Sequence, residues 1–269
     1  MNRSNIKMEN IEHFRRKLSE LSRKYSLTGE TGKSPALSIV IPVFNERNRL
    51  PKTLLVTIAW CNENLPSYEV LVSDDGSTDD TLELARLCAE YDDNVRILSC
   101  PHLGKGAAVR MGMLNARGEK VLFMDADGAT PLEEIPKLAN KLEEGYPVAI
   151  GSRVVLDPKA TQVKISLHRK MVGRVFSSIV RLFAVGGIRD TQCGFKMFRQ
   201  DACKEIFRRQ KLTGFAFDVE ILYLARRMSL AVAEVPVNWV NQQESKVNIL
   251  TDSLKMLKDV AMIRMSHLF

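Results

Sequence analysis

Two aspartates, Asp125 and Asp127, flank Ala126 directly after the apolar run Val121–Met124. Two carboxylates this close at the end of a strand cannot both be buried without a counter-charge, which a divalent cation would supply. Mg²⁺ typically binds one or two carboxylates, keeps several waters and takes its remaining ligands from substrate phosphates. The segment therefore predicts a site for Mg²⁺ or Mn²⁺ and a diphosphate, and a solvated acidic turn is the alternative.

Two other segments also place polar side chains directly after apolar runs. Asp75 follows one such run, where an acidic residue can accept hydrogen bonds from a ribose or a base. Ser77 can cap the helix that follows, so helix capping alone is the alternative interpretation of this segment. In the segment 42–46 (PVFNE), an aromatic, an amide and a carboxylate stand together and could frame a nucleobase.

Apolar runs alternate with helical patterns along the first part of the chain. The expected strands are Leu37–Val43, Tyr68–Ser73, Val95–Ser99, Lys120–Met124 and Val148–Ser152. The expected helices are 49–63, 78–91, 106–116 and 132–144. This alternation indicates an α/β fold with a mostly parallel, doubly wound sheet, and residues 231–239 predict a further strand.

Ligands of such sheets bind beyond the carboxyl ends of the strands. The loops that this rule should bring into one crevice are 44–48, 74–77, 101–105 and 125–130. His102 lies in one of these loops and could approach a substrate.

The composition is that of a globular protein with an excess of positive charge. The chain has 269 residues, 45% apolar and 26% charged, and a net charge of +7. Its basic residues interleave with apolar helix faces and no recognition motif is present, so nucleic acid is not an expected partner. The five cysteines lack CxxC spacing, which favours reduced thiols that serve packing.

Amphipathic segments favour a peripheral contact with an anionic membrane. Residues 164–189 contain six Lys or Arg residues and no acidic residue beside an apolar face, which suits a helix on a bilayer surface. A helix packed on the sheet is the alternative, and residues 250–268 are either a second interfacial element or a core helix. An apolar signal-peptide segment and a run long enough for a transmembrane helix are both missing from the sequence.

Seven motifs occur in order along the chain: SIVIPVFNE, VSDDGSTDDT, HLGKGAAVRMGM, FMDADGAT, GSR, RDTQCGFKMF and FDVEILY. Together they resemble the family 2 glycosyltransferases, which have the GT-A fold. Within that family they look like the dolichyl-phosphate β-glucosyltransferases, with the dolichyl-phosphate mannosyltransferases as close relatives. The resemblance covers about residues 37–268.

The resemblance implies a domain organisation. Residues 37–249 would form the GT-A domain, with a nucleotide-sugar half at about 37–152 and an acceptor half at about 153–249. Outside that domain, within residues 1–36, the spacing of apolar residues predicts an amphipathic helix at 9–25, and the Gly-, Ser- and Thr-rich composition of 26–36 predicts a linker. The same kind of spacing predicts a C-terminal amphipathic helix within residues 250–269.

The resemblance also implies roles for residues at the matching positions. Those that would bind the nucleotide sugar are Pro42, Phe44, Asn45, Glu46, Asp75, Lys105, Asp125, Ala126 and Asp127. Lys105 belongs instead to a solvated face in the alternative interpretation. Asp125 and Asp127 would hold the metal. The implied catalytic residues are Arg153 and Lys196, which would meet phosphates, Asp190 near the reacting carbon, and Asp218.

This chain departs from the family pattern in two places. Ala129 stands where the mannosyl relatives often have a glutamine as an extra metal ligand. A metal would then rest on the two aspartates, phosphates and water. The glucosyl branch often begins with a hydrophobic anchor, whereas this chain has the charged amphipathic stretch 9–25.

The implied reaction is an inverting transfer of glucose from UDP-glucose to a polyprenyl phosphate, at the cytoplasmic side of a membrane. A phosphomonoester has a second pKa near 6, so the acceptor is largely ionised and Asp190 is expected to position it or to assist modestly. The alternatives are GDP-mannose or another donor, a soluble acceptor, and a non-catalytic nucleotide-sugar binding protein. Residues expected in the core rather than in a lipid groove are Met197, Phe198, Phe215 and Trp239.

Overall fold

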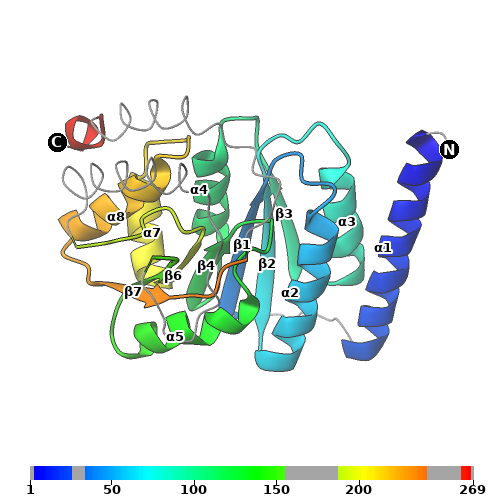
Figure 1. Cartoon of the computed structure of the whole chain (residues 1–269), viewed down its shortest axis with the longest axis horizontal. Helices are drawn as coiled ribbons and strands as arrows, with labels where there is room; N and C mark the ends of the chain where they lie inside the picture. The colour runs from blue at the N-terminus through cyan, green and yellow to red at the C-terminus, as the bar shows by residue number, and fades with distance from the viewer. Residues whose placement is uncertain (1–2, 26–33, 155–186, 241–261, 268–269) are drawn as a thin grey trace.

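The computed structural model describes residues 3–25, 34–154, 187–240 and 262–267 (Figure 1). Most of the basic segment 164–189, of the linker 26–36 and of the C-terminal segment 250–268 therefore lies outside the described residues.

A seven-stranded sheet crosses the middle of the described chain (Figure 1). Its strand order is β3-β2-β1-β4-β6-β5-β7. The strands are β1 Leu37–Val43, β2 Tyr68–Asp74, β3 Val95–Ser99, β4 Lys120–Met124, β5 Val148–Ser152, β6 Phe195–Arg199 and β7 Val232–Pro236. The expected mostly parallel sheet is confirmed, and β6, which the sequence did not indicate, runs antiparallel between β4 and β5.

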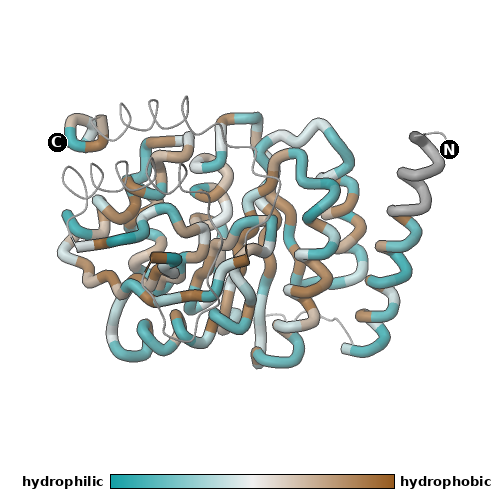
Figure 2. Tube along the Cα trace, in the orientation of Figure 1, coloured by the Kyte–Doolittle hydropathy of each residue, from teal (hydrophilic) through white to brown (hydrophobic). Residues whose placement is uncertain are grey.

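Helices cover both faces of this sheet. One face packs against α2 Leu50–Asn64, α3 Thr81–Tyr91 and α5 Ile135–Glu143, which follows the short turn η1 Leu132–Glu134. A further helix, α1 Arg3–Tyr25, packs on α2 and α3. The other face packs against α4 Lys105–Asn115, α7 Gln200–Arg209 and α8 Phe217–Arg227. All seven residues of β1 are buried, as expected for a strand covered on both sides. Hydrophobic residues accordingly concentrate along the central strands (Figure 2).

The N-terminal helix α1 packs on the rest of the protein through one apolar face. Phe14 and Leu18 are buried in the core, and Ile11, Leu21 and Tyr25 pack against it. The expected amphipathic helix is confirmed and begins at Arg3. It contacts α2 and α3 and lies at one edge of the molecule, at the opposite end from the C-terminus (Figure 1). Among the described residues, no helix is both long and apolar enough to cross a membrane.

A buried carboxylate ties together the strand ends that face away from the loops expected to bind ligand. Glu69, only 4% exposed, accepts hydrogen bonds from Ser38 Oγ at 2.6 Å and from the Arg117 backbone N–H at 2.6 Å. Its other oxygen lies 2.7 Å from Arg96 Nη1. One side chain thus links β1, β2, β3 and the chain entering β4.

Replacing Glu69 should therefore destabilise the sheet. We expect Glu69→Ala to lower the free energy of unfolding by about 2–4 kcal/mol, because it leaves buried donors unsatisfied and Arg96 without its partner. Urea denaturation measures this change. Glu90→Ala, at an exposed position of α3, is the control and should stay within about 0.5 kcal/mol of the parent. Equal midpoints for the two variants would contradict the role assigned to Glu69.

Candidate active site

Four loops at the carboxyl ends of the strands are joined into one region, as expected. The Asn45 backbone N–H donates to Ser77 Oγ at 2.9 Å, which connects the loops after β1 and β2. Asp75 accepts hydrogen bonds from the backbone N–H groups of Leu103 and Gly104, which connects the loops after β2 and β3. Lys105 reaches the loop after β4, where its Nζ lies 2.7 Å from Asp125 Oδ1.

The Asp125-Ala126-Asp127 segment is held by contacts from two directions. The Asp125 backbone N–H donates to the carbonyl of Gly194, just before β6, at 3.1 Å. Thr53 Oγ on α2 donates to the Ala126 carbonyl at 2.7 Å. The Ala129 backbone N–H donates to Asp127 Oδ1 at 3.0 Å. The two aspartates thus leave the strand in a fixed turn, and Ala126 contributes its backbone to that turn.

Burial and like charge make this pair of carboxylates costly. Burial, followed by the charge of Asp125, raises the pKa of Asp127 above its ordinary value. Burial alone would lower the pKa of Lys105, but the carboxylates of Asp125 and Asp218 outweigh it and raise this pKa. Lys105 therefore supplies positive charge to the pair, which agrees with its predicted place in the site and not with a solvated face.

The residues present fit a divalent cation that is completed by a phosphate-bearing ligand. Within the described part of the chain no group of three or more His, Cys, Asp or Glu residues could enclose a metal. Asp125 and Asp127, whose like charges repel each other, are the two carboxylates available to a cation. Mg²⁺ usually binds one or two protein carboxylates. Gly194 makes room for them, since a Cβ at that position would stand 2.0 Å from Asp125 Oδ2.

Arg153 and Asp190 form a bidentate ion pair. Arg153 Nε lies 2.8 Å from Asp190 Oδ2, and its Nη2 donates to Asp190 Oδ1 at 2.9 Å. Burial alone would raise the pKa of Asp190, but these hydrogen bonds bring it below its ordinary value. Asp190 is thus an ionised, 5% exposed partner of Arg153. This geometry favours the positioning role over proton transfer.

The prediction that Lys196 meets a phosphate does not agree with its position in the structure. Lys196 is fully buried and pairs with Asp218, and it also donates to the Cys193 carbonyl at 2.7 Å. Burial raises the pKa of Asp218 despite the nearby Lys196 and Lys105. Neither side chain reaches the surface, and the charge of Asp218 acts on the neighbouring Lys105. A part for this pair in catalysis stays a prediction.

The residues expected to hold the nucleoside lie at the ends of β1 and β2. Phe44 stacks on His102, with ring centroids 4.1 Å apart and an interplanar angle of 14°. His102 Nδ1 lies 2.7 Å from Asp75 Oδ2, so the 2% exposed Asp75 holds the loop that carries the histidine. The exposed aromatic surface here comes from Phe44 and His102.

The remaining members of this predicted nucleoside set have structural partners. Pro42 is buried within β1. Asn45 Oδ1 accepts a hydrogen bond from the Thr78 backbone N–H at 2.8 Å. Glu46 lies 3.4 Å from Arg49 Nε, and its backbone N–H donates to Thr81 Oγ at 2.8 Å. These residues shape the loop after β1, and their contact with a nucleoside stays a prediction.

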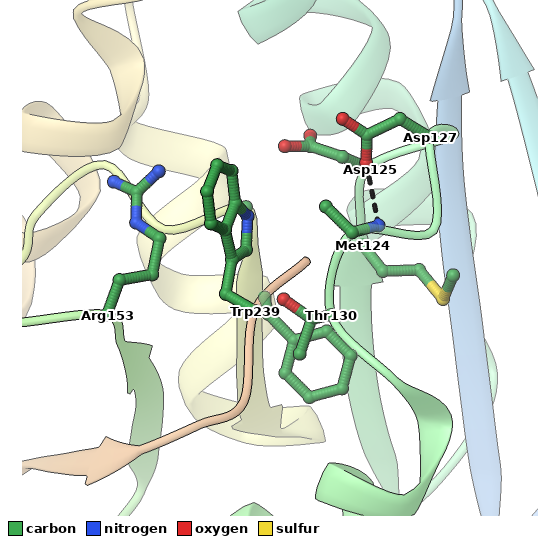
Figure 3. A pocket seen from close by; sticks show the side chains of 9 residues that line it. Met124, Asp125, Asp127, Thr130, Arg153 and Trp239 are labelled. Atoms are coloured by element: carbon green, nitrogen blue, oxygen red, sulfur yellow. Dashed lines mark hydrogen bonds between the residues drawn. The ribbon is translucent and has the colours of Figure 1, made fainter. Parts of the chain in front are cut away.

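A hollow opens beside the two aspartates (Figure 3). Its walls include Asp125, Asp127, Thr130, Arg153 and Trp239. Trp239 stands between Arg153 on one side and the aspartates on the other (Figure 3). The prediction that Trp239 and Phe215 are core residues is wrong, because Trp239 is only partly buried and Phe215 is 42% exposed. The same prediction is confirmed for Met197 and Phe198, which are fully buried.

Glu220, which belongs to the FDVEILY motif, is a buried positioning residue. Its carboxylate accepts hydrogen bonds from the backbone N–H groups of Lys211 and Leu212, both at 2.8 Å, and lies 2.7 Å from His267 Nε2. The next carbonyl, that of Thr213, accepts from the Gly106 N–H at 2.7 Å at the start of α4. This buried acid therefore supports the helix that presents Lys105.

Comparisons with known proteins identify the family and agree with the fold. The family model described as Glycosyl transferase family 2 matches residues 38–207. A dolichyl-phosphate beta-glucosyltransferase of Homo sapiens is 38% identical over 246 residues, which cover 86% of this chain and 76% of that protein. Its counterpart of Saccharomyces cerevisiae is 38% identical over 250 residues, which cover 86% of this chain and 75% of that protein.

Solved structures show the same fold at lower identity. Glucosyl-3-phosphoglycerate synthase from Mycobacterium tuberculosis, in complex with Mn²⁺ and UDP-glucose, has a TM-score of 0.60 at 20% identity, over 93% of this chain and 82% of that one. Mannosyl-3-phosphoglycerate synthase from Rubrobacter xylanophilus has a TM-score of 0.62 at 20% identity, over 93% and 77%. Because the family model spans more than half of the sequence, the chain belongs to glycosyl transferase family 2.

Proposed function

We propose that this protein transfers glucose from UDP-glucose to a polyprenyl phosphate of the dolichyl type and gives a β-linked glycolipid. The observation that carries the proposal is the pair Asp125 and Asp127, which meets Lys105 at the carboxyl edge of the sheet. Curated relatives named dolichyl-phosphate beta-glucosyltransferase, 38% identical over most of the chain, support the choice of sugar and acceptor.

The donor half of the mechanism rests on charge. Asp125 and Asp127 would hold Mg²⁺ or Mn²⁺ against the diphosphate of the donor, with Lys105 beside them. When bound, the cation would stabilise the negative charge that grows on the nucleoside diphosphate as the glycosidic bond breaks. Phe44 and His102 offer a stacked aromatic surface on which the base can rest.

The acceptor half needs an oriented cation more than a base. The lipid phosphate is largely ionised near neutral pH, so its oxygen can attack without losing a proton first. Arg153 would bind that phosphate, and the bidentate contact with Asp190 fixes the plane of its guanidinium. A single displacement inverts the anomeric carbon, so an α-linked donor gives a β-linked product.

We also propose that the protein works at the cytoplasmic side of a membrane, in peripheral contact with anionic lipid.

The first test is formation of the product. Purified protein, UDP-glucose, a short polyprenyl phosphate and Mg²⁺ or Mn²⁺ should yield a glucosylated lipid that mass spectrometry detects. GDP-mannose and a soluble phosphate acceptor, run in parallel, decide the donor and the acceptor. If the lipid receives no sugar from any donor while a soluble acceptor does, the lipid-acceptor proposal is wrong. Binding of UDP-glucose without any product would favour a non-catalytic protein.

The carboxylate role has its own test. Asp127→Asn should lower the turnover by about a hundredfold or more, because it removes half of the charge that holds the cation and diphosphate. Initial rates over a range of Mn²⁺ concentrations measure the effect. Asp93→Asn, at an exposed position between α3 and β3, is the matched control. A variant at Asp127 that keeps the parent rate and metal dependence would refute this assignment.

The close approach of Gly194 gives a second test. In Gly194→Ala the new methyl group would push the Asp125 carboxylate out of place, since the Cβ position is 2.0 Å from its Oδ2. We expect UDP binding in the presence of Mn²⁺ to weaken and turnover to fall by up to about a hundredfold. Gly214→Ala, where no atom lies within 4 Å of the added Cβ, controls for the glycine change. Calorimetric titration with UDP separates the two variants, and equal affinities would argue against a carboxylate displaced in this way.

A further inference from the structure

The order of the strand ends along the sheet indicates where each part of a nucleotide-sugar donor would lie. In the strand order β2-β1-β4-β6-β5-β7, Phe44 follows β1, Asp125 follows β4, Arg153 follows β5 and Trp239 follows β7. A nucleotide sugar has its base at one end, its diphosphate in the middle and its hexose at the other end. With the base near Phe44 and the diphosphate at Asp125, the hexose falls on the side of Trp239.

Trp239 is fixed in place by the backbone on both sides. The Val237 N–H donates to the Ser152 carbonyl at the end of β5 at 3.1 Å. The Val240 N–H donates to the Ala129 carbonyl, in the loop of the two aspartates, at 2.8 Å. The residue before it also has an anchor, since Asn238 Nδ2 donates to Glu134 Oε1 at 2.9 Å. These hydrogen bonds hold the backbone that carries the indole against both the end of β5 and the loop of the two aspartates.

The surroundings of the indole suit a sugar ring. The indole lines one hollow together with Asp125, Asp127 and Thr130, so an aromatic face, two carboxylates and a hydroxyl border the same space. Arg153 lies over the indole, 5.7 Å from the ring centroid. The aspartates stand on the other side of it (Figure 3).

We propose that Trp239 is the platform on which the hexose of the donor rests, between the carboxylates and Arg153. The face of an aromatic ring carries partial negative charge, and a pyranose presents C–H groups with partial positive charge on its apolar face. The ring oxygens and hydroxyls then point away from the indole, toward the polar walls. Stacking on the side of the indole that faces the carboxylates would hold the anomeric carbon beside the diphosphate, while Arg153 supports the indole from the opposite side (Figure 3). This inference rests on the proposed function, because it assumes a nucleotide-sugar donor.

The test compares two ligands that differ only in the hexose. We expect Trp239→Leu to weaken UDP-glucose binding by roughly tenfold with Mg²⁺, and to leave the affinity for UDP within about twofold of the parent. Trp239→Phe, which keeps an aromatic face, should recover most of the loss. Calorimetric titration without acceptor gives both dissociation constants, and normal UDP binding shows that the variant is folded.

Fluorescence gives an independent reading, because the chain has only two tryptophans. Trp60 lies on α2 and packs against the core on the α1 side. In Trp60→Phe the emission comes from Trp239 alone, and UDP-glucose should change it more than UDP does. In Trp239→Phe, where Trp60 is the remaining tryptophan, the two ligands should leave the emission unchanged.

The outcomes separate the two proposals. Equal losses for UDP and UDP-glucose in Trp239→Leu would assign the residue a structural role and overturn the inference. Unchanged UDP-glucose affinity in that variant would overturn it as well. If the parent protein binds UDP-glucose and only the variant results fail, the proposed function stands without the platform. A parent protein that does not bind UDP-glucose overturns the proposed function and the inference with it.

Discussion

The site depends on the repulsion between two half-buried carboxylates, Asp125 and Asp127, which are separated by one residue at the end of β4. Burial and the neighbouring charge raise the pKa of Asp127, and nearby positive charge opposes that shift. Lys105 supplies part of that charge, at 2.7 Å from Asp125. Below it, Lys196 and Asp218 form a second, fully enclosed ion pair. A metal with its phosphate ligand would complete this charge balance.

The antiparallel strand β6 makes the arrangement possible. It enters the sheet between β4 and β5 from the ligand side, so the chain just before it runs beside the two aspartates. Gly194 occupies that position, where its carbonyl accepts the Asp125 N–H and no side chain obstructs the carboxylate. The same strand places Lys196 inside the protein. One reversed strand thus supplies both the space beside Asp125 and the buried charge of Lys196.

The first half of the fold could be predicted because its strands are continuous apolar runs between helical patterns. The same signal failed for β6, where Lys196 interrupts the run and its partner Asp218 is 22 residues away. It also failed at Trp239: the apolar pattern continues through residue 239, but β7 ends at Pro236, and the chain turns to contact the aspartate loop. Pairings such as Glu220 with the Lys211 backbone have no sequence pattern, because they depend on how α8 packs.

Three ion pairs at and beneath the hollow are already formed before any ligand arrives. Asp190 fixes Arg153, Asp125 holds Lys105, and Asp218 neutralises Lys196. Pairing limits the movement of these side chains. The free-energy cost of orienting them is therefore met when the protein folds and does not add to the barrier of the reaction. An ionised phosphate can then exchange for a carboxylate partner at Lys105 or share Arg153 with Asp190. A reaction between two phosphate-bearing substrates suits such a site, because it needs fixed positive charge at two places and no proton acceptor.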